Sequence, residues 1–131
     1  MAAAPPVAKV SVWHSRDLQK LRPASLESLG HFGNHRANFI RRDRTGEAEV
    51  HVRTADVFVI QTGQATLVTG GRIPNAKSST KTEIRGASIE GGQSQVLVPG
   101  DIVQIPAGLP HQFVLARGAE VTYFALKIDG K

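Results

Sequence analysis

The feature that most constrains the fold is a close succession of short apolar or alternating runs from residue 37 onward. Gly, Pro, Asn and Thr interrupt these runs every few residues. Short runs rich in Val, Ile and Thr are typical of strands, and the polar breaks between them are typical of turns. The pattern predicts strands at 37–42, 48–53, 57–61, 65–69, 82–84, 95–98, 102–105, 112–115 and 121–128.

Many short strands with little helix favour an antiparallel sandwich or barrel. A chain of 131 residues, 40% of them hydrophobic, suffices for one compact domain with a core. We therefore predict an all-β fold, with an N-terminal arm over 1–35 and a barrel domain over 36–131. Within the arm, Ser15 is expected to cap a short helix that ends before Pro23.

Two further stretches carry local predictions. Residues 25–29 are expected to form one more helical turn that ends at Gly30. The polar stretch 74–81 is expected to be a surface loop on a long hairpin.

Several classes of protein are excluded by composition. The chain has no cysteine, which excludes a disulfide scaffold, a thiolate metal site and a cysteine nucleophile. No apolar run approaches the roughly 18–20 residues of a transmembrane helix, and the start lacks the features of a secretory signal. Two locations stay open: cytoplasmic, or periplasmic or secreted if the Ala-rich start is the junction left by a removed signal peptide.

The net charge of +5 arises in the first third of the chain. Residues 1–44 hold eight Lys or Arg and three acidic residues, a difference of +5, with a local cluster at 41–44 (Arg-Arg-Asp-Arg). Such a cluster can attract nucleic acid. With aromatic residues at 5% and scattered, there is no base-stacking platform, so a solvated strand end or a patch that faces a partner subunit is the stronger interpretation.

The most specific local pattern runs from Gly100 to His111. A turn glycine precedes an apolar strand, a rigid corner at Pro106 and Gly108, and a histidine three residues after that second glycine. Proline fixes φ, and glycine permits conformations that other residues resist. The corner should therefore aim His111 reproducibly, as a metal ligand requires.

A second pattern lies upstream. Asp56 precedes Gly63 by six intervening residues, His51 lies five residues before Asp56, and Glu49 lies two residues before His51. Residues two apart on one strand point to the same side, so Glu49 and His51 should share a face.

The Gly100–His111 pattern resembles the second signature of the cupin superfamily, G-x5-P-x-G-x2-H-x3-N, with Leu115 in place of the final Asn. The upstream pattern resembles a degenerate first signature, G-x5-H-x-H-x3,4-E-x6-G. Glu49 stands at the first histidine and Asp56 at the glutamate. The resemblance covers about residues 45–128, is to small single-domain cupins of the cupin-2 type, and implies a double-stranded β-helix, or jelly-roll barrel, after a short helical arm.

The resemblance also implies one divalent metal ion inside the barrel, held by Glu49, His51, Asp56 and His111. Imidazoles and carboxylates of this kind suit Fe, Mn, Ni, Co or Zn. Two roles stay open for Asp56, which is a ligand or a group that orients a ligand histidine. Glu49 is likewise a ligand or the catalytic general base.

Five residues are predicted to line the substrate pocket. Phe58 and Ile60 share the parity of Asp56, Phe113 shares that of His111, and Gln104 and Tyr123 offer polar groups. The resemblance implies a metal-dependent enzyme, of the dioxygenase, lyase or isomerase class, that acts on a small organic molecule. The alternative is a non-catalytic small-ligand-binding or sensing cupin. A homodimer is expected in either case.

Overall fold

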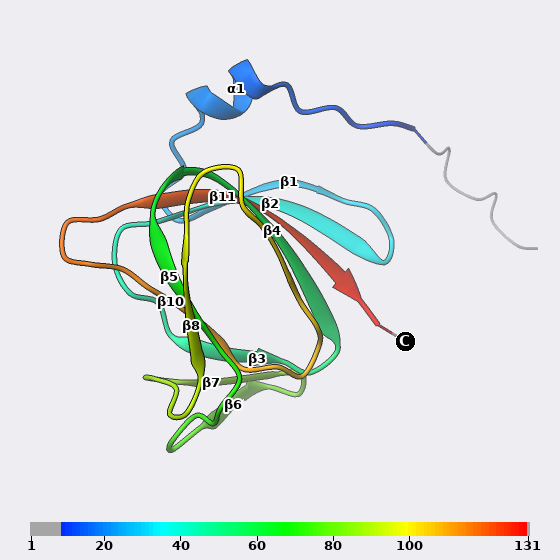
Figure 1. The fold of residues 1–131 in the computed structure, drawn as a ribbon. Helices are drawn as coiled ribbons and strands as arrows, with labels where there is room; N and C mark the ends of the chain where they lie inside the picture. Colours follow the sequence, from blue (N-terminus) through cyan, green and yellow to red (C-terminus); the bar gives the residue numbers. More distant parts are fainter. Residues whose placement is uncertain (1–8, 131) are drawn as a thin grey trace, which may run out of the picture.

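The computed structural model describes residues 9–130, and two antiparallel sheets face each other around a buried interior (Figure 1). The Ala-rich start lies outside the described residues. The five-stranded sheet has the spatial order β1 (Leu26–His31), β2 (His35–Arg42), β11 (Val121–Asp129), β4 (Thr54–Gly63) and β9 (Ile102–Ile105). The six-stranded sheet has the order β6 (Lys77–Thr80), β7 (Glu83–Gly86), β3 (Ala48–His51), β10 (His111–Val114), β5 (Ala65–Thr69) and β8 (Gln93–Leu97).

The predicted all-β barrel is confirmed, and each strand predicted from the alternating runs corresponds to an observed strand. The helical turn expected over 25–29 is wrong, because this segment forms β1 and pairs with β2, with Leu26 opposite Ile40. The loop expected over 74–81 is wrong in part, since β6 pairs with β7 there in an exposed hairpin.

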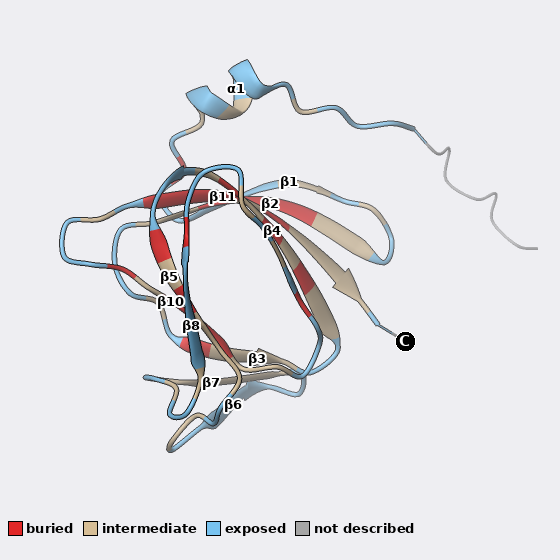
Figure 2. Cartoon of the chain, viewed as in Figure 1, coloured by how far each residue is buried: buried red, intermediate tan, exposed pale blue. Residues whose placement is uncertain are grey.

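The core lies between the sheets, and Figure 2 shows buried residues on strands of both sheets. Burial of these apolar side chains is the main stabilising contribution to the fold. The buried cluster contains Ile40, Phe58, Ile60, Ala65, Leu67, Leu97, Ile105, Phe113, Leu115, Val121, Tyr123 and Ala125.

The part of the N-terminal arm that precedes β1 packs on the outer face of the five-stranded sheet. It contains the predicted short helix, α1 (Ser15–Lys20), but the cap expected at Ser15 is wrong, because the N-cap is His14 and makes no side-chain capping hydrogen bond. Just before α1, the ring of Trp13 lies 5.8 Å from that of Phe124 on β11 and 6.1 Å from that of Phe32. Within residues 9–130, we find no helix with the length and apolarity to span a membrane.

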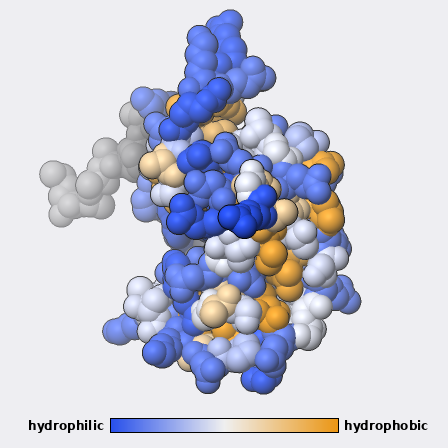
Figure 3. All heavy atoms as spheres, turned by 90° about the vertical axis from the view of Figure 1, so that its left-hand side faces the viewer, coloured by the Kyte–Doolittle hydropathy of each residue, from blue (hydrophilic) through white to orange (hydrophobic). Residues whose placement is uncertain are grey.

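The two sheets end at β8 and β9, which are consecutive along the chain. Val96, Val98 and Ile102 are exposed at these edges. One face of the molecule also carries a strip of apolar side chains among hydrophilic ones (Figure 3). Unpaired edges are sites where strands of another chain can associate. The expected homodimer stays a prediction.

Candidate metal centre

Strand pairing brings Glu49, His51 and His111 together. In the six-stranded sheet, β3 lies beside β10, and Glu49 is directly opposite His111. Because His51 is two residues after Glu49 on β3, its side chain points to the same side. One ligand atom from each of the three residues lies within 4.8 Å of the others.

The corner predicted at Pro106 and Gly108 holds this arrangement. Gly108 has a φ of +85°, which a side chain disfavours. Its N–H donates to the carbonyl oxygen of His51 over 2.9 Å, so the corner is fixed directly to β3. His111 follows the corner and is buried, with 5% of its surface exposed.

Asp56 comes to the same place from the opposite sheet. It lies on β4, is 1% exposed, and accepts a hydrogen bond from Lys127 of β11 at Oδ1, over 2.8 Å. Its other oxygen, Oδ2, is 3.7 Å from Nε2 of His51 and 3.7 Å from Nε2 of His111.

The separations among these atoms fit ligands of one ion. Glu49 Oε2 lies 3.2 Å from His51 Nε2 and 3.9 Å from His111 Nε2. Nitrogen and oxygen ligands stand about 2.1 Å from a metal such as zinc, so two ligands of one ion are about 3–4 Å apart.

Two of the converging atoms are buried without a hydrogen bond, namely His51 Nε2 and Asp56 Oδ2. Leaving a buried polar atom unsatisfied is costly, and such atoms in native proteins usually have a missing partner. His111 Nδ1 lies 3.2 Å from the carbonyl oxygen of Leu109. A proton on Nδ1 would leave the Nε2 lone pair free to face the cluster. The donor set therefore fits a cation.

The surroundings of these groups favour the protonation states that bind a metal ion, namely neutral imidazole and ionised carboxylate. Burial lowers the pKa of His111, which favours the neutral imidazole that binds metals. Burial alone would raise the pKa of Glu49, but the neighbouring His51 imidazole and Arg85 guanidinium outweigh it and lower that pKa to about 2. Arg85 Nη1 lies 3.0 Å from Glu49 Oε1.

The low pKa of Glu49 predicts a pH dependence of stability in the metal-free protein. Between about pH 4.5 and about pH 2, the unfolded carboxyl binds a proton while the folded one does not, so the free energy of unfolding falls as the pH falls. Glu49→Gln should lack this contribution of about 2–3 kcal/mol. Urea unfolding at a series of pH values measures it, and equal slopes for the two proteins would contradict it.

The interior cavity beside these residues is small, about 30 Å³. Phe58 and Phe113 line it, in agreement with their predicted parity, and Tyr123 lines it as well. Ile60 is buried in the core and is not part of this lining. Gln104 is exposed, because its neighbours Val103 and Ile105 take the inward positions of β9, so the structure does not bring it to the cavity.

Two residues missed by the sequence analysis, Arg42 and Lys127, also line the cavity. Arg42 belongs to the basic cluster that was interpreted as a solvated strand end. The signal that would have found both was parity, since Arg42 comes two residues after the core residue Ile40 on β2, and Lys127 comes two residues after Ala125 on β11.

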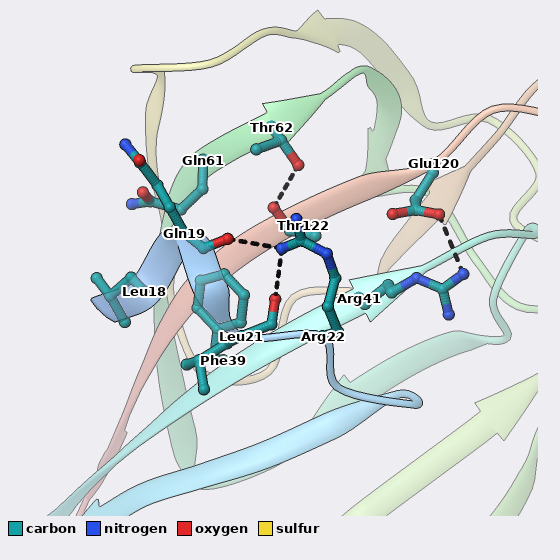
Figure 4. A pocket seen from close by; sticks show the side chains of 10 residues that line it. All are labelled: Leu18, Gln19, Leu21, Arg22, Phe39, Arg41, Gln61, Thr62, Glu120 and Thr122. Carbon is teal, nitrogen blue, oxygen red and sulfur yellow. Dashed lines mark hydrogen bonds and ion pairs between the residues drawn. The ribbon is translucent and has the colours of Figure 1, made fainter. Parts of the chain in front are cut away.

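A wider hollow of about 380 Å³ lies outside the barrel, between α1 and the five-stranded sheet (Figure 4). Phe39 and Arg41, which line it, alternate along β2 with the inward Ile40 and Arg42. Arg41 is paired with Glu120 over 3.0 Å. The hollow is thus on the opposite face of the sheet from the metal centre and contains none of the candidate ligands.

Comparison with known proteins places the chain by its structure. No family model and no curated protein matches the sequence. Among solved structures, BH2720 from Bacillus halodurans has a TM-score of 0.71 at 13% identity, covering 94% of this chain and 83% of that one. A Cupin 2 conserved barrel domain protein from Salinispora arenicola CNS-205 has a TM-score of 0.57 at 17% identity, covering 94% and 91%. Hydroquinone 1,2-dioxygenase from Sphingomonas sp. TTNP3, with 4-hydroxybenzoate bound, has a TM-score of 0.61 at 13% identity, covering 95% and 82%.

Proposed function

Given that the chain has the cupin fold, we propose that it is a metal-dependent enzyme that acts on a small organic molecule at the barrel interior. The resemblance drawn from the two sequence patterns is confirmed at the level of the fold. The proposal is carried by one observation: Glu49 Oε2 lies 3.2 Å from His51 Nε2 and 3.9 Å from His111 Nε2, and His51 Nε2 is buried without a hydrogen bond. Asp56 Oδ2, which is also buried without a hydrogen bond, lies 3.7 Å from each of the two imidazole nitrogens. A fold supports many activities, so the function is argued from this site.

We assign His51, His111 and Glu49 as the residues that would hold the ion, one of Fe, Mn, Ni, Co or Zn. When bound, the ion supplies a Lewis acid beside open coordination positions. Glu49 suits a ligand better than a general base, because a carboxyl with a pKa of about 2 takes up protons poorly. Asp56 offers Oδ2 to the same centre while Lys127 holds Oδ1, which fixes the orientation of the carboxylate.

Aromatic rings form one wall of the cavity beside this centre. The ring of Phe58 lies 5.4 Å from that of Phe113 and 5.1 Å from that of Tyr123. Burial raises the pKa of Tyr123 to about 12, so its hydroxyl keeps its proton at neutral pH and remains a hydrogen-bond donor. Electrostatic interactions are stronger in such a low-dielectric site than in water.

The alternative proposal is a non-catalytic small-ligand-binding or sensing protein. The departures from the two cupin signatures favour it, because Glu49 stands at the first histidine and Leu115 at the final Asn. Both proposals share the metal centre. They differ in whether a bound organic molecule is turned over.

Metal content tests the shared part. We expect about one equivalent of a divalent ion after reconstitution of the chelator-treated protein. His51→Ala and His111→Ala should each weaken its binding on the order of 100-fold or more, since each removes a ligand. Elemental analysis after gel filtration and the metal-dependent rise in Tm measure this.

His35→Ala is the matched control, because that imidazole lies on β2 and bonds to Asn34 away from the cluster. It should retain the ion fully. Reconstituted wild-type protein without a stoichiometric ion, or a folded His51→Ala/His111→Ala variant that binds it normally, would refute the proposed function.

A further inference from the structure

Arg42 brings an unpaired positive charge to the candidate metal centre. It is the last residue of β2, and its inward side chain lines the interior cavity together with Glu49 and His111. Its Nε donates to the Tyr123 hydroxyl over 2.9 Å, and its guanidinium carbon lies 5.6 Å from the centre of the Phe113 ring. These contacts hold the planar group in place and leave both Nη groups available.

The other half-buried arginines all have carboxylate partners. Arg36 pairs with Asp129, Arg41 with Glu120, and Arg85 with three glutamates. Among residues 9–130, no carboxylate lies within 4.0 Å of the Arg42 guanidinium, and neither Nη group donates to another residue. A half-buried guanidinium is normally paired, because removing a charge from water is costly. A group from outside the chain would supply that partner.

The charges around the cavity have the same implication. Glu47, Glu49 and Asp56 contribute three negative charges, and Arg42 and Lys127 contribute two positive charges. A divalent ion would therefore leave one positive charge in excess around the interior. An anion is the ligand that balances this excess.

The position of Arg42 also connects the interior to the surface. An outer hollow of about 410 Å³, lined by residues 41–47 with Ala24 and Ser25, shares Arg42 and Glu47 with the interior cavity. The absence of a side chain at Gly46 leaves room for the Arg42 guanidinium at this position, because a Cβ at Gly46 would lie 2.5 Å from Arg42 Nη1. A ligand can thus rest in the outer hollow, which has the volume of an ordinary ligand pocket, with one end at Arg42 and the metal centre beyond.

We propose that the ligand of this site is a small organic carboxylate and that Arg42 is the residue that binds its carboxylate group. This deepens the proposed function and rests on it. The two Nη groups offer the parallel N–H donors that match the two oxygens of a carboxylate. Tyr123 is a positioning residue, since it holds Nε and so orients the guanidinium.

Calorimetric titration with matched pairs of probes tests the proposal. The probes are acetate, glycolate and benzoate, each beside its uncharged amide, titrated into metal-loaded protein and, in parallel, into chelator-treated protein. We expect wild type to bind at least one carboxylate in preference to its amide. Arg42→Gln should weaken that carboxylate about 10- to 100-fold and leave the amide and the metal content unchanged.

Two variants make the readout specific. Arg42→Lys keeps the positive charge but loses the two parallel N–H donors of the guanidinium. It should therefore bind the carboxylate with an affinity between those of wild type and Arg42→Gln. If Arg42→Gln fails to fold, Arg42→Lys tests the proposal in its place. Arg117→Gln is the matched control, because it removes the same charge from an exposed side chain that lines neither the interior cavity nor the outer hollow. It should bind as wild type does.

The outcomes separate this inference from the metal proposal. Equal carboxylate affinity in folded Arg42→Gln and wild type, an equal loss in Arg117→Gln, or no preference of wild type for any carboxylate overturns the role of Arg42. Absence of the ion from wild-type protein refutes the metal centre alone. In that case the carboxylate preference and its loss in Arg42→Gln, measured on metal-free protein, still support the anion site.

Discussion

Replacing Lys127 with methionine is expected to destabilise the metal-free protein by about 3 kcal/mol. Lys127 Nζ lies 2.8 Å from Asp56 Oδ1, and the Asp56 side chain is 1% exposed. Methionine has a similar length but no charge, so the substitution leaves a buried carboxylate without its partner. Urea unfolding of the chelator-treated protein measures the loss.

A double-mutant cycle identifies the cause. Adding Asp56→Asn to Lys127→Met removes the orphaned charge and should recover a large part of the lost stability. Lys81→Met is the matched control on an exposed side chain and should change stability by less than about 0.5 kcal/mol. If Lys127→Met were as stable as Lys81→Met, the buried pair would not contribute as we describe.

Gly63→Ala is expected to destabilise the protein by on the order of 4 kcal/mol, or to prevent folding. Gly63 ends β4 with a φ of +78°, where a side chain is strained. A Cβ there would also overlap the backbone carbonyl oxygen of Glu120, which no side-chain rotation can relieve. Thermal and urea unfolding measure the effect.

Gly70→Ala separates the two causes. Gly70 has nearly the same φ, +77°, but a Cβ there would have no atom within 4 Å. Its substitution should cost only the backbone strain, about 1–2 kcal/mol. A similar loss in both variants would show that the contact with Glu120 can be relieved.

Much of the barrel was predictable because alternation records which face of a strand is buried. The predicted parities of Phe58 and Phe113 agree with their places in the cavity wall. The corner at Pro106 and Gly108 was equally informative, since its two special residues define a backbone path whatever packs around it. Both the alternation and the corner are set by residues close together in the sequence, so the sequence alone is enough to predict them.

The missed features depend on partners distant in the sequence. Residues 25–29 have no strong strand pattern, and β1 exists because β2 offers it an edge. Arg42 and Lys127 are charged, so the sequence alone suggested water rather than the interior for them. Their inward placement depends on Tyr123 and Asp56, which only the strand register brings alongside.

The position of β11 has a consequence for how the molecule is made. It is the last strand along the chain, yet it lies between β2 and β4 in the middle of its sheet. During synthesis, β2 and β4 emerge first, and neither can pair with β11 until that strand has also emerged. We therefore expect native structure to form slowly and to be complete only after β11 has emerged from the ribosome.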